Sequence, residues 1–454
     1  MSTLHGELED SRQRLEALLT QGDLESARDI ALTLHASDLA DLVETLDEDV
    51  RVRLLSVLPA EQASEALAEM DEGEDRGDLL AALAPEKGAE LLSELPDDDA
   101  ADLIAELEPG EQQRILEALP AEEAGDLIEL LEYGEDTAGG LMTTELVAID
   151  ASLTAAEAIA EVRRQGREVG VFYVVWVVDS ERRLLGTLNL DQLVMADPAS
   201  SIADIVQEPV ATVLPSVDQE EVGRLIARYN VVSLPVVDER GVLLGRITFD
   251  DVIDVLEAEQ TEDILLMAGL GHGDEALRYT WRQSVKARMP WLLANLGTAA
   301  LASAVVFLFS ETIESVVILA AIMPIVAGLG GNAGTQALAV TARSLAVDRD
   351  PHDMTPLRHH VGRELTVGLI NGALLGSIVA LIATLLGGDA MLGVVVLLAM
   401  WGNLAVAGFL GSFVPSIMDR LGYDPAVSSS MFVTPFTDLC GFLFLLGLGS
   451  WLLL

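Results

Sequence analysis

A single carboxylate in an apolar stretch is the residue of this sequence with the clearest chemical potential. Asp438 lies about 12 residues into the apolar stretch 426–453, roughly 18 Å deep for a helix rising 1.5 Å per residue. A charged group at such a depth in a membrane is costly and almost always faces a water-filled path or a partner. Because the apolar stretches contain no Lys or Arg, we expect a cation as the partner. The alternative is a structural Asp that accepts hydrogen bonds from nearby Thr or backbone N–H groups.

The second polar feature is the glycine-rich run PIVAGLGGNAGTQ at 324–336, which lies inside another apolar stretch. Its glycines allow backbones to approach closely and leave carbonyl groups accessible. Asn332, near the middle of the stretch, adds a neutral oxygen ligand. Close packing of helices through small residues is the alternative interpretation of the glycines. The run also fits a loose dinucleotide-binding pattern, but no strand precedes it, so we set that interpretation aside.

Five apolar stretches, each long enough to cross a bilayer as a helix, hold these residues. They cover 290–309, 316–341, 365–386, 391–417 and 426–453. Basic residues lie before the first stretch, between the second and third, and between the fourth and fifth, but not in the other connectors or at the C-terminus. By the positive-inside rule we expect a multi-pass protein of the cell inner (plasma) membrane, with the N-terminus cytoplasmic and the C-terminus outside.

The charge of the chain is concentrated in its N-terminal part. Residues 1–276 contain 64 acidic and 17 basic side chains, a net charge of −47, whereas residues 277–454 are almost neutral. Such acidity disfavours nucleic acid as a partner, since phosphates are bound by Lys and Arg, and it favours divalent cations. Adaptation to a salty cytoplasm is an alternative contribution, which also fits the scarcity of lysine.

Residues 1–138 are predicted to form an acidic all-α domain of helical repeats. Apolar residues recur at helical spacing, and prolines recur after 24 residues, from Pro85 to Pro109 and from Pro96 to Pro120. The text repeats as well, since LSELPDDDAADLIAEL is followed by LEALPAEEAGDLIELL. Proline is well tolerated near a helix start. Each unit is therefore interpreted as a helix pair in a solenoid.

Residues 139–254 contain an internal duplication of a strand–strand–helix unit about 60 residues long. VFYVVWVVD with ERRLLGTLNLDQL is repeated as VVSLPVVD with ERGVLLGRITFDDV. The unit resembles the CBS domain, a small α/β module that associates in tandem pairs. The resemblance implies a candidate site for an adenine nucleotide such as ATP at Thr248 and Asp251. The first copy has Asn189 and Gln192 at the equivalent positions.

The fold class that we expect is multidomain. An all-α helical-repeat N-terminal domain (1–138) is followed by an α/β tandem CBS pair (139–254) and a connecting, or plug, helix (255–280). The rest, 281–454, is a transmembrane domain of five helices. Acidic residues cover much of the connecting helix, which leads directly toward the membrane.

This order of domains, with PIVAGLGGNAGTQ and FVT-x-x-TD in the apolar half, resembles the MgtE family of Mg²⁺ channels over essentially the whole chain. The resemblance implies a homodimer in membrane lipid, with Asp438 and Asn332 along a pore on the dimer axis. It also implies that Mg²⁺ is both the transported ion and a cytoplasmic regulator that closes the channel. The regulatory ligands that it implies are Asp98, Asp102, Asp218, Glu220, Asp251, Asp254, Glu259, Glu262, Asp263 and Asp424.

Two other classes of function stay open. A secondary transporter that couples a divalent cation to protons or Na⁺ could use Asp438 as its proton site, although no inverted repeat and no second carboxylate in the core of an apolar stretch is found. A signalling protein whose apolar stretches only tether a sensor would need neither Asp438 nor Asn332. No nucleophile or nucleotide-hydrolysis motif appears, so an enzyme is not expected.

Overall fold

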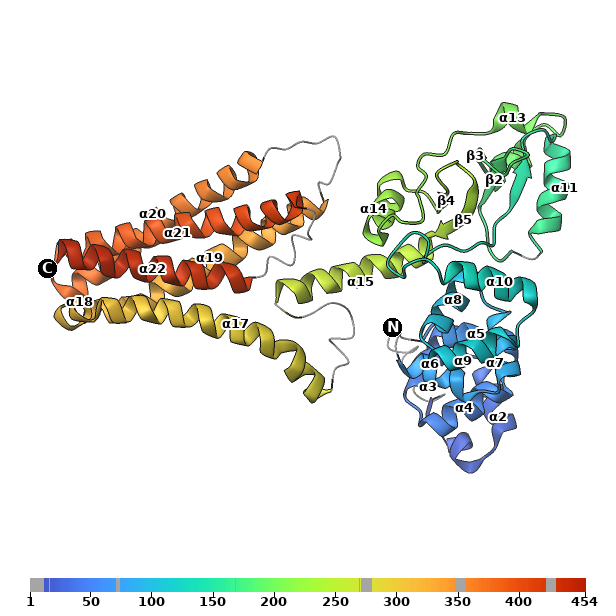
Figure 1. The fold of residues 1–454 in the computed structure, drawn as a ribbon, viewed down its shortest axis with the longest axis horizontal. Helices are drawn as coiled ribbons and strands as arrows, with labels where there is room; N and C mark the ends of the chain where they lie inside the picture. Colours follow the sequence, from blue (N-terminus) through green and yellow to red (C-terminus); the bar gives the residue numbers. More distant parts are fainter. Residues whose placement is uncertain are drawn as a thin grey trace. The chain divides into compact units, whose positions relative to one another are not determined.

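The computed structural model of the chain has two compact units, Met1–Leu256 and Glu257–Leu454 (Figure 1). It describes residues 12–70 without 16, 74–268 without 168, residue 270, and residues 280–347, 357–421 and 430–454. The two units differ in kind, since the first combines short helices with small sheets and the second is a bundle of long helices (Figure 1).

The first unit begins with a stack of short helices. Each helix packs on the helix two positions further along the chain, from α2 on α4 to α8 on α10. This is the packing of a helical solenoid, and it confirms the predicted repeats. The helices are α2 (Leu24–Ala31), α3 (Ala36–Glu44), α4 (Glu48–Val57), α5 (Ala60–Ala68), α6 (Glu74–Ala82), α7 (Pro85–Leu92), α8 (Asp97–Ala105), α9 (Pro109–Leu116) and α10 (Ala121–Leu130).

Prolines mark where these helices begin. Pro85 and Pro109 are in the first turn of α7 and α9, while Pro59, Pro96 and Pro120 directly precede α5, α8 and α10. Proline costs little there, because the first N–H groups of a helix have no partner within the helix. One hydrophobic core runs through the stack and continues into the second of the two strand repeats, so the stack and that repeat are packed together.

The two strand repeats have the same local geometry, as expected of a duplicated CBS unit. Each has an antiparallel hairpin with a register shift at the end of its first strand. In each turn an aspartate, Asp179 or Asp238, accepts hydrogen bonds from the backbone N–H groups two and four residues further on. The strands are β1 (Ala148–Asp150), β2 (Val174–Val178), β3 (Leu184–Asn189), β4 (Ser233–Val237) and β5 (Leu243–Thr248), and the helices are α11 (Ala155–Gln165), α12 (Leu190–Met195), α13 (Ile202–Ile205) and α14 (Gln219–Tyr229).

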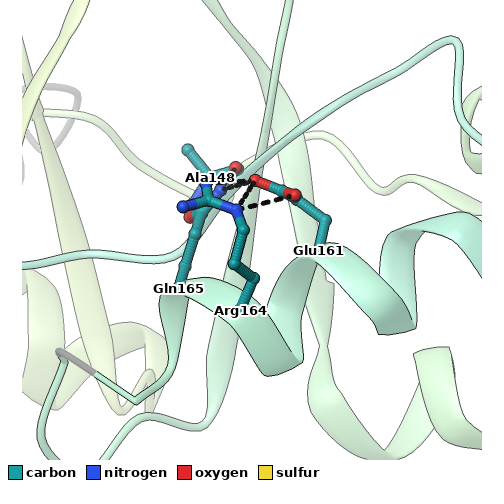
Figure 2. Close-up of polar contacts among 4 residues, drawn as sticks. All are labelled: Ala148, Glu161, Arg164 and Gln165. Carbon is teal, nitrogen blue, oxygen red and sulfur yellow. Dashed lines mark hydrogen bonds and ion pairs between the residues drawn. The ribbon is translucent and has the colours of Figure 1, made fainter.

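One glutamine side chain satisfies the free edge of the first sheet, whose strand order is β1-β2-β3. Gln165 accepts a hydrogen bond from the Ala148 N–H at 2.9 Å and donates one to the Ala148 carbonyl at 2.8 Å (Figure 2). Its amide also donates to Glu161 at 2.7 Å, and Arg164 donates to the same carboxylate (Figure 2). The amide group of Gln165 therefore takes the place of a neighbouring strand.

Among the described residues of the second unit, five helices are long and apolar enough to cross a membrane, in agreement with the five predicted spans. Helix α21 packs against α19, α20 and α22, α19 also packs on α22, and α17 packs on α22 (Figure 1). The connector predicted at 310–315 is itself a short helix, α18 (Ser310–Ser315). The long helices are α17 (Trp281–Leu308), α19 (Ile318–Val347), α20 (Leu357–Gly387), α21 (Ala390–Arg420) and α22 (Ser430–Leu452).

Helix α15 (Phe249–Met267) follows β5 directly and continues across the division between the two units after Leu256. It therefore begins before the predicted connecting segment 255–280. Its first turn contains Asp250 and Asp251, so the helix starts with negative charge close to its N-terminal N–H groups.

Replacing Gln165 with Ala should loosen the edge of the first sheet. The substitution leaves the Ala148 N–H and C=O without their side-chain partner, which costs about 1–2 kcal/mol of local stability. Hydrogen exchange of the Ala148 amide in the full chain should therefore become about tenfold faster. Arg164→Ala is the matched control, since it removes a side chain bonded to the same Glu161 carboxylate and keeps Gln165. An unchanged rate in Gln165→Ala would contradict the role of the amide.

Candidate functional site

A polar face of α19 is left uncovered by the other helices of its unit. Gly328, Asn332, Thr335 and Gln336 recur at intervals of three or four residues, and all of them are exposed. Lipid cannot satisfy such polar groups. If α19 crosses a membrane, this face must therefore meet water or another protein surface.

The other glycines of the run lie on packed faces of α19. Gly331 lies against Thr434 of α22, and a Cβ at Gly331 would be 3.2 Å from its methyl carbon. Gly334 lies so close to Val433 that a Cβ there would overlap with the valine side chain. These glycines permit close packing of α19 on α22. The run thus combines the two interpretations, since its buried glycines pack and its exposed residues form a polar surface.

Asp438 is half-buried on α22, the helix that lies against this part of α19. The two helices run antiparallel, since Gly331 lies against Thr434 and a Cβ at Gly441 would be 3.2 Å from a side-chain carbon of Val326. Asp438 falls between these two contacts. Asn332 directly follows Gly331, so Asp438 and Asn332 are about one helical turn apart along the bundle.

A second acidic group lies at the start of α8, in the first unit. Asp98 is 8% exposed, and its Oδ1 atom has no hydrogen-bond partner among the residues that the structure describes. Burial raises the pKa of the Asp98 carboxyl well above its usual range, and the nearby Asp251 and Asp99 raise it further. The structure thus brings together Asp98 and Asp251, two of the predicted regulatory residues, which are 153 positions apart in the sequence.

Three further carboxyls, which sequence reasoning missed, belong to the same group. Burial, followed by the charge of Asp251, raises the pKa of Asp99 to about 6. Burial, followed by the charge of Asp97, raises the pKa of Glu145 to about 7. Asp97 accepts a hydrogen bond from the Thr144 hydroxyl. The DDD triplet at the start of α8 was the available signal, but its partners come from the strand repeats and could not be read from the sequence.

Arg246 and Arg76 provide positive charge near this group. Arg246 is 7% exposed, and its Nε atom donates a 2.8 Å hydrogen bond to the Glu145 backbone carbonyl. It lies close enough to Asp98 and Asp251 to be affected by both charges. Two guanidinium groups cannot balance five ionised carboxylates, so the group in its ionised form has an excess of negative charge that a divalent cation could reduce.

The candidate nucleotide residues Thr248 and Asp251 contact each other. The Asp251 carboxylate accepts hydrogen bonds from the Thr248 N–H at 3.2 Å and from the Thr248 hydroxyl. In the first repeat, Gln192 accepts one from the Asn189 N–H at 3.3 Å. Both pairs thus cap the start of a helix. If a nucleotide binds there, the same residues would have this structural role as well.

The remaining predicted regulatory residues are dispersed. Asp218 accepts a hydrogen bond from the Glu220 N–H at the start of α14, and the Glu220 carboxylate forms an ion pair with Arg224. Asp102 lies on α8, and Asp254, Glu259, Glu262 and Asp263 lie on α15. Asp424 lies outside the described residues. Within the described ranges no group of three or more His, Cys, Asp or Glu side chains is close enough to hold a metal ion directly.

Family models match most of the chain. Residues 323–448 match a divalent cation transporter domain named MgtE, residues 34–136 match the MgtE intracellular N domain, and residues 138–198 and 202–258 match CBS domains. The chain is 35% identical to the magnesium transporter MgtE of Thermus thermophilus, covering 97% of this chain and 98% of the relative. It is 34% identical to the magnesium transporter MgtE of Enterococcus faecalis, covering 98% and 97%.

Solved structures resemble the first unit. The crystal structure of the cytosolic domain of the Mg²⁺ channel MgtE in complex with ATP matches with a TM-score of 0.52 and 37% identity, covering 54% of this chain and 99% of that one. The soluble part of a magnesium transporter matches with a TM-score of 0.51 and 34% identity, covering 55% and 98%. These matches confirm the helical-repeat region and the CBS pair.

The acidic group at α8 should make the first unit less stable as the pH rises. The pKa values of Asp99 and Glu145 in the folded chain, about 6 and about 7, lie above their ordinary values of 3.8 and 4.5. The folded state therefore binds more protons, so the stability that protonation contributes is lost as the pH rises through these values. In EDTA, hydrogen-exchange protection of α8 should fall by about tenfold between pH 5.5 and pH 8.

Glu145→Gln is the control for this pH dependence. It removes one of the carboxyls whose pKa lies in this range, so the fall in protection should become smaller. Protection that stays constant or rises with pH, after correction for intrinsic exchange, would contradict the assignment.

Proposed function

Since the chain belongs to the MgtE family of magnesium transporters, we propose that it is a homodimeric Mg²⁺ channel with Asp438 and Asn332 on its ion path. The chain is a transporter and not an enzyme. The observation that carries the proposal is the polar face of α19, exposed beside the half-buried Asp438. In a dimer, the same face of the partner would enclose a polar path, which removes the conflict with lipid.

The chemistry of these side chains suits Mg²⁺. Two Asp438 carboxylates, one from each subunit, would balance the charge of one divalent cation. Mg²⁺ loses its water reluctantly and is often bound through it. Carboxylate and amide oxygens that accept hydrogen bonds from bound water are therefore sufficient to hold the hydrated ion weakly, as conduction requires.

A coupled carrier is the competing mechanism, and the structure adds one residue to it. Glu364 is 8% exposed on α20, within a candidate membrane helix, and lies 3.6 Å from the exposed Arg363. It is near the start of that helix, on the side predicted to be cytoplasmic, and an arginine accompanies it. We therefore favour a role for Glu364 at the cytoplasmic end of the ion path, where it does not exchange protons. Currents in liposomes without a proton or Na⁺ gradient would distinguish a channel from a carrier.

We further propose that cytoplasmic Mg²⁺ closes the channel by reducing the repulsion among the carboxyls at α8. The unpartnered Oδ1 of Asp98 fits a cation, and Asp98 with Asp251 would hold it, assisted by the other acidic side chains around them. Binding to the compact state alone shifts the equilibrium toward that state. Because Asp251 is in the first turn of α15, and α15 precedes the membrane helices along the chain, compaction at α8 can act on the path through this helix.

The other features of the proposal concern ATP and the membrane. A related cytosolic domain was crystallised with ATP, so ATP is a candidate ligand of the CBS pair, with Thr248 and Asp251 beside it. The five apolar helices make the chain a multi-pass membrane protein. From the distribution of Lys and Arg we propose a cell inner membrane with the C-terminus outside.

Asp438→Asn tests the ion path. The substitution keeps the shape of the side chain but removes its charge, so Mg²⁺ flux into liposomes should fall at least tenfold while the dimer still assembles. Asp389→Asn is the matched control, because Asp389 caps α21 by accepting a hydrogen bond from the Met391 N–H and Asn can do the same. Normal flux in Asp438→Asn would remove Asp438 from the path.

Limited proteolysis tests the sensor. Protection of the first unit should increase as Mg²⁺ rises through the millimolar range, and it should increase much less in Asp98→Asn than in Glu48→Gln, an exposed acid on α4. The reason is that Asp98, unlike Glu48, is held away from water near other carboxyls. If K⁺ at equal ionic strength gave the same protection, screening alone would explain it and the sensor site would be wrong.

A further inference from the structure

A buried amide on α21 contacts the glycine-rich run. Asn403 is fully buried, and its Nδ2 atom donates a 2.9 Å hydrogen bond to the backbone carbonyl of Val326 on α19. The bond connects two helices that are far apart in the sequence. The other amide atom, Oδ1, has no hydrogen-bond partner among the described residues.

Both neighbouring helices have a glycine where the amide lies. A Cβ at Gly330 of α19 would overlap with the Asn403 amide nitrogen, and a Cβ at Gly441 of α22 would lie 2.8 Å from the same atom. Asn403 therefore occupies a slot between α19 and α22 that only glycine on both sides leaves open. Any larger residue at either position would displace the amide.

This slot lies next to the residues of the proposed ion path. Gly330 is two residues before Asn332, and Gly441 is three residues after Asp438. The position of the Asn403 amide thus fixes the spacing and the relative height of the two helix segments that carry Asn332 and Asp438.

Packing alone does not explain an asparagine here. A buried amide with one atom unpartnered is costly in an apolar bundle, whereas an apolar side chain would fill the same space without that cost. A hydrogen bond is directional, so it selects one register between the helices where apolar contact would permit several. We propose that Asn403 is a positioning residue for the ion path, which it sets through α19 and α22; this inference rests on the proposed role of Asp438 and Asn332.

Asn403→Leu tests the proposal in the full-length dimer in liposomes. Leu has the same branching at Cγ but no donor, so the bond to Val326 is lost and the slot stays filled. We expect the permeability ratio of Mg²⁺ to Ca²⁺ to fall at least fivefold and the half-saturating Mg²⁺ concentration to rise. Ser412→Ala is the control, because Ser412 is buried on the same helix but its hydroxyl donates to Gly408 of its own helix at 2.7 Å. It should leave both quantities within twofold of wild type.

A second variant covers a failure of Asn403→Leu to fold. Gly330→Ala leaves Asn403 in place but pushes its amide away from Val326, and should change the permeability ratio in the same direction. If both folded variants keep the wild-type ratio and half-saturation while Asp438→Asn abolishes flux, the positioning role of Asn403 is wrong and the proposed path stands. If Asp438→Asn conducts normally, the path itself is wrong, whatever the Asn403 variants show.

Discussion

A carboxylate that is held away from water needs positive charge nearby, and this chain holds carboxylates in that way in both of its units. Asp438 lies half-buried among apolar helices, and Asp98 is buried beside Asp251 and Asp99. Neither site has enough built-in positive charge, because Arg246 and Arg76 are outnumbered by the carboxyls of the second group and no Lys or Arg lies within the apolar stretch around the first. A mobile cation can supply what the sequence does not, which is a physical basis for both transport and sensing.

The glycines of α19 make the first of these sites feasible. A polar face on a membrane helix is stable only when the opposite faces are packed so tightly that the helix cannot rotate it into lipid. Gly331 and Gly334 allow contact with α22, and Gly330 admits the Asn403 amide. The packed side of the run thus holds the exposed side, with Asn332, in one orientation.

The sequence was sufficient for features that depend on local patterns. Hydropathy predicts the five membrane helices, proline spacing predicts the helical stack, and the isolated Asp438 is visible because a charge in an apolar stretch is rare. Features that depend on tertiary contact could not be predicted in the same way. Asp99 and Glu145 resemble the many other surface acids until the fold places them together. Asn403 likewise has no local pattern, since its role follows from glycines on two other helices.

The distinction between buried and exposed acids also decides which of the many carboxylates can sense a cation. At physiological ionic strength, exposed charges separated by more than about 8 Å are screened by monovalent salt, so most of the net charge of −47 in residues 1–276 responds to any electrolyte. Carboxyls that are desolvated and close together are screened much less, and their repulsion is relieved only by a cation or a proton that enters the group. In the proposed sensor, therefore, the abundant surface acids would respond to any electrolyte, while the few close to α8 would respond to Mg²⁺ in a way that K⁺ does not reproduce.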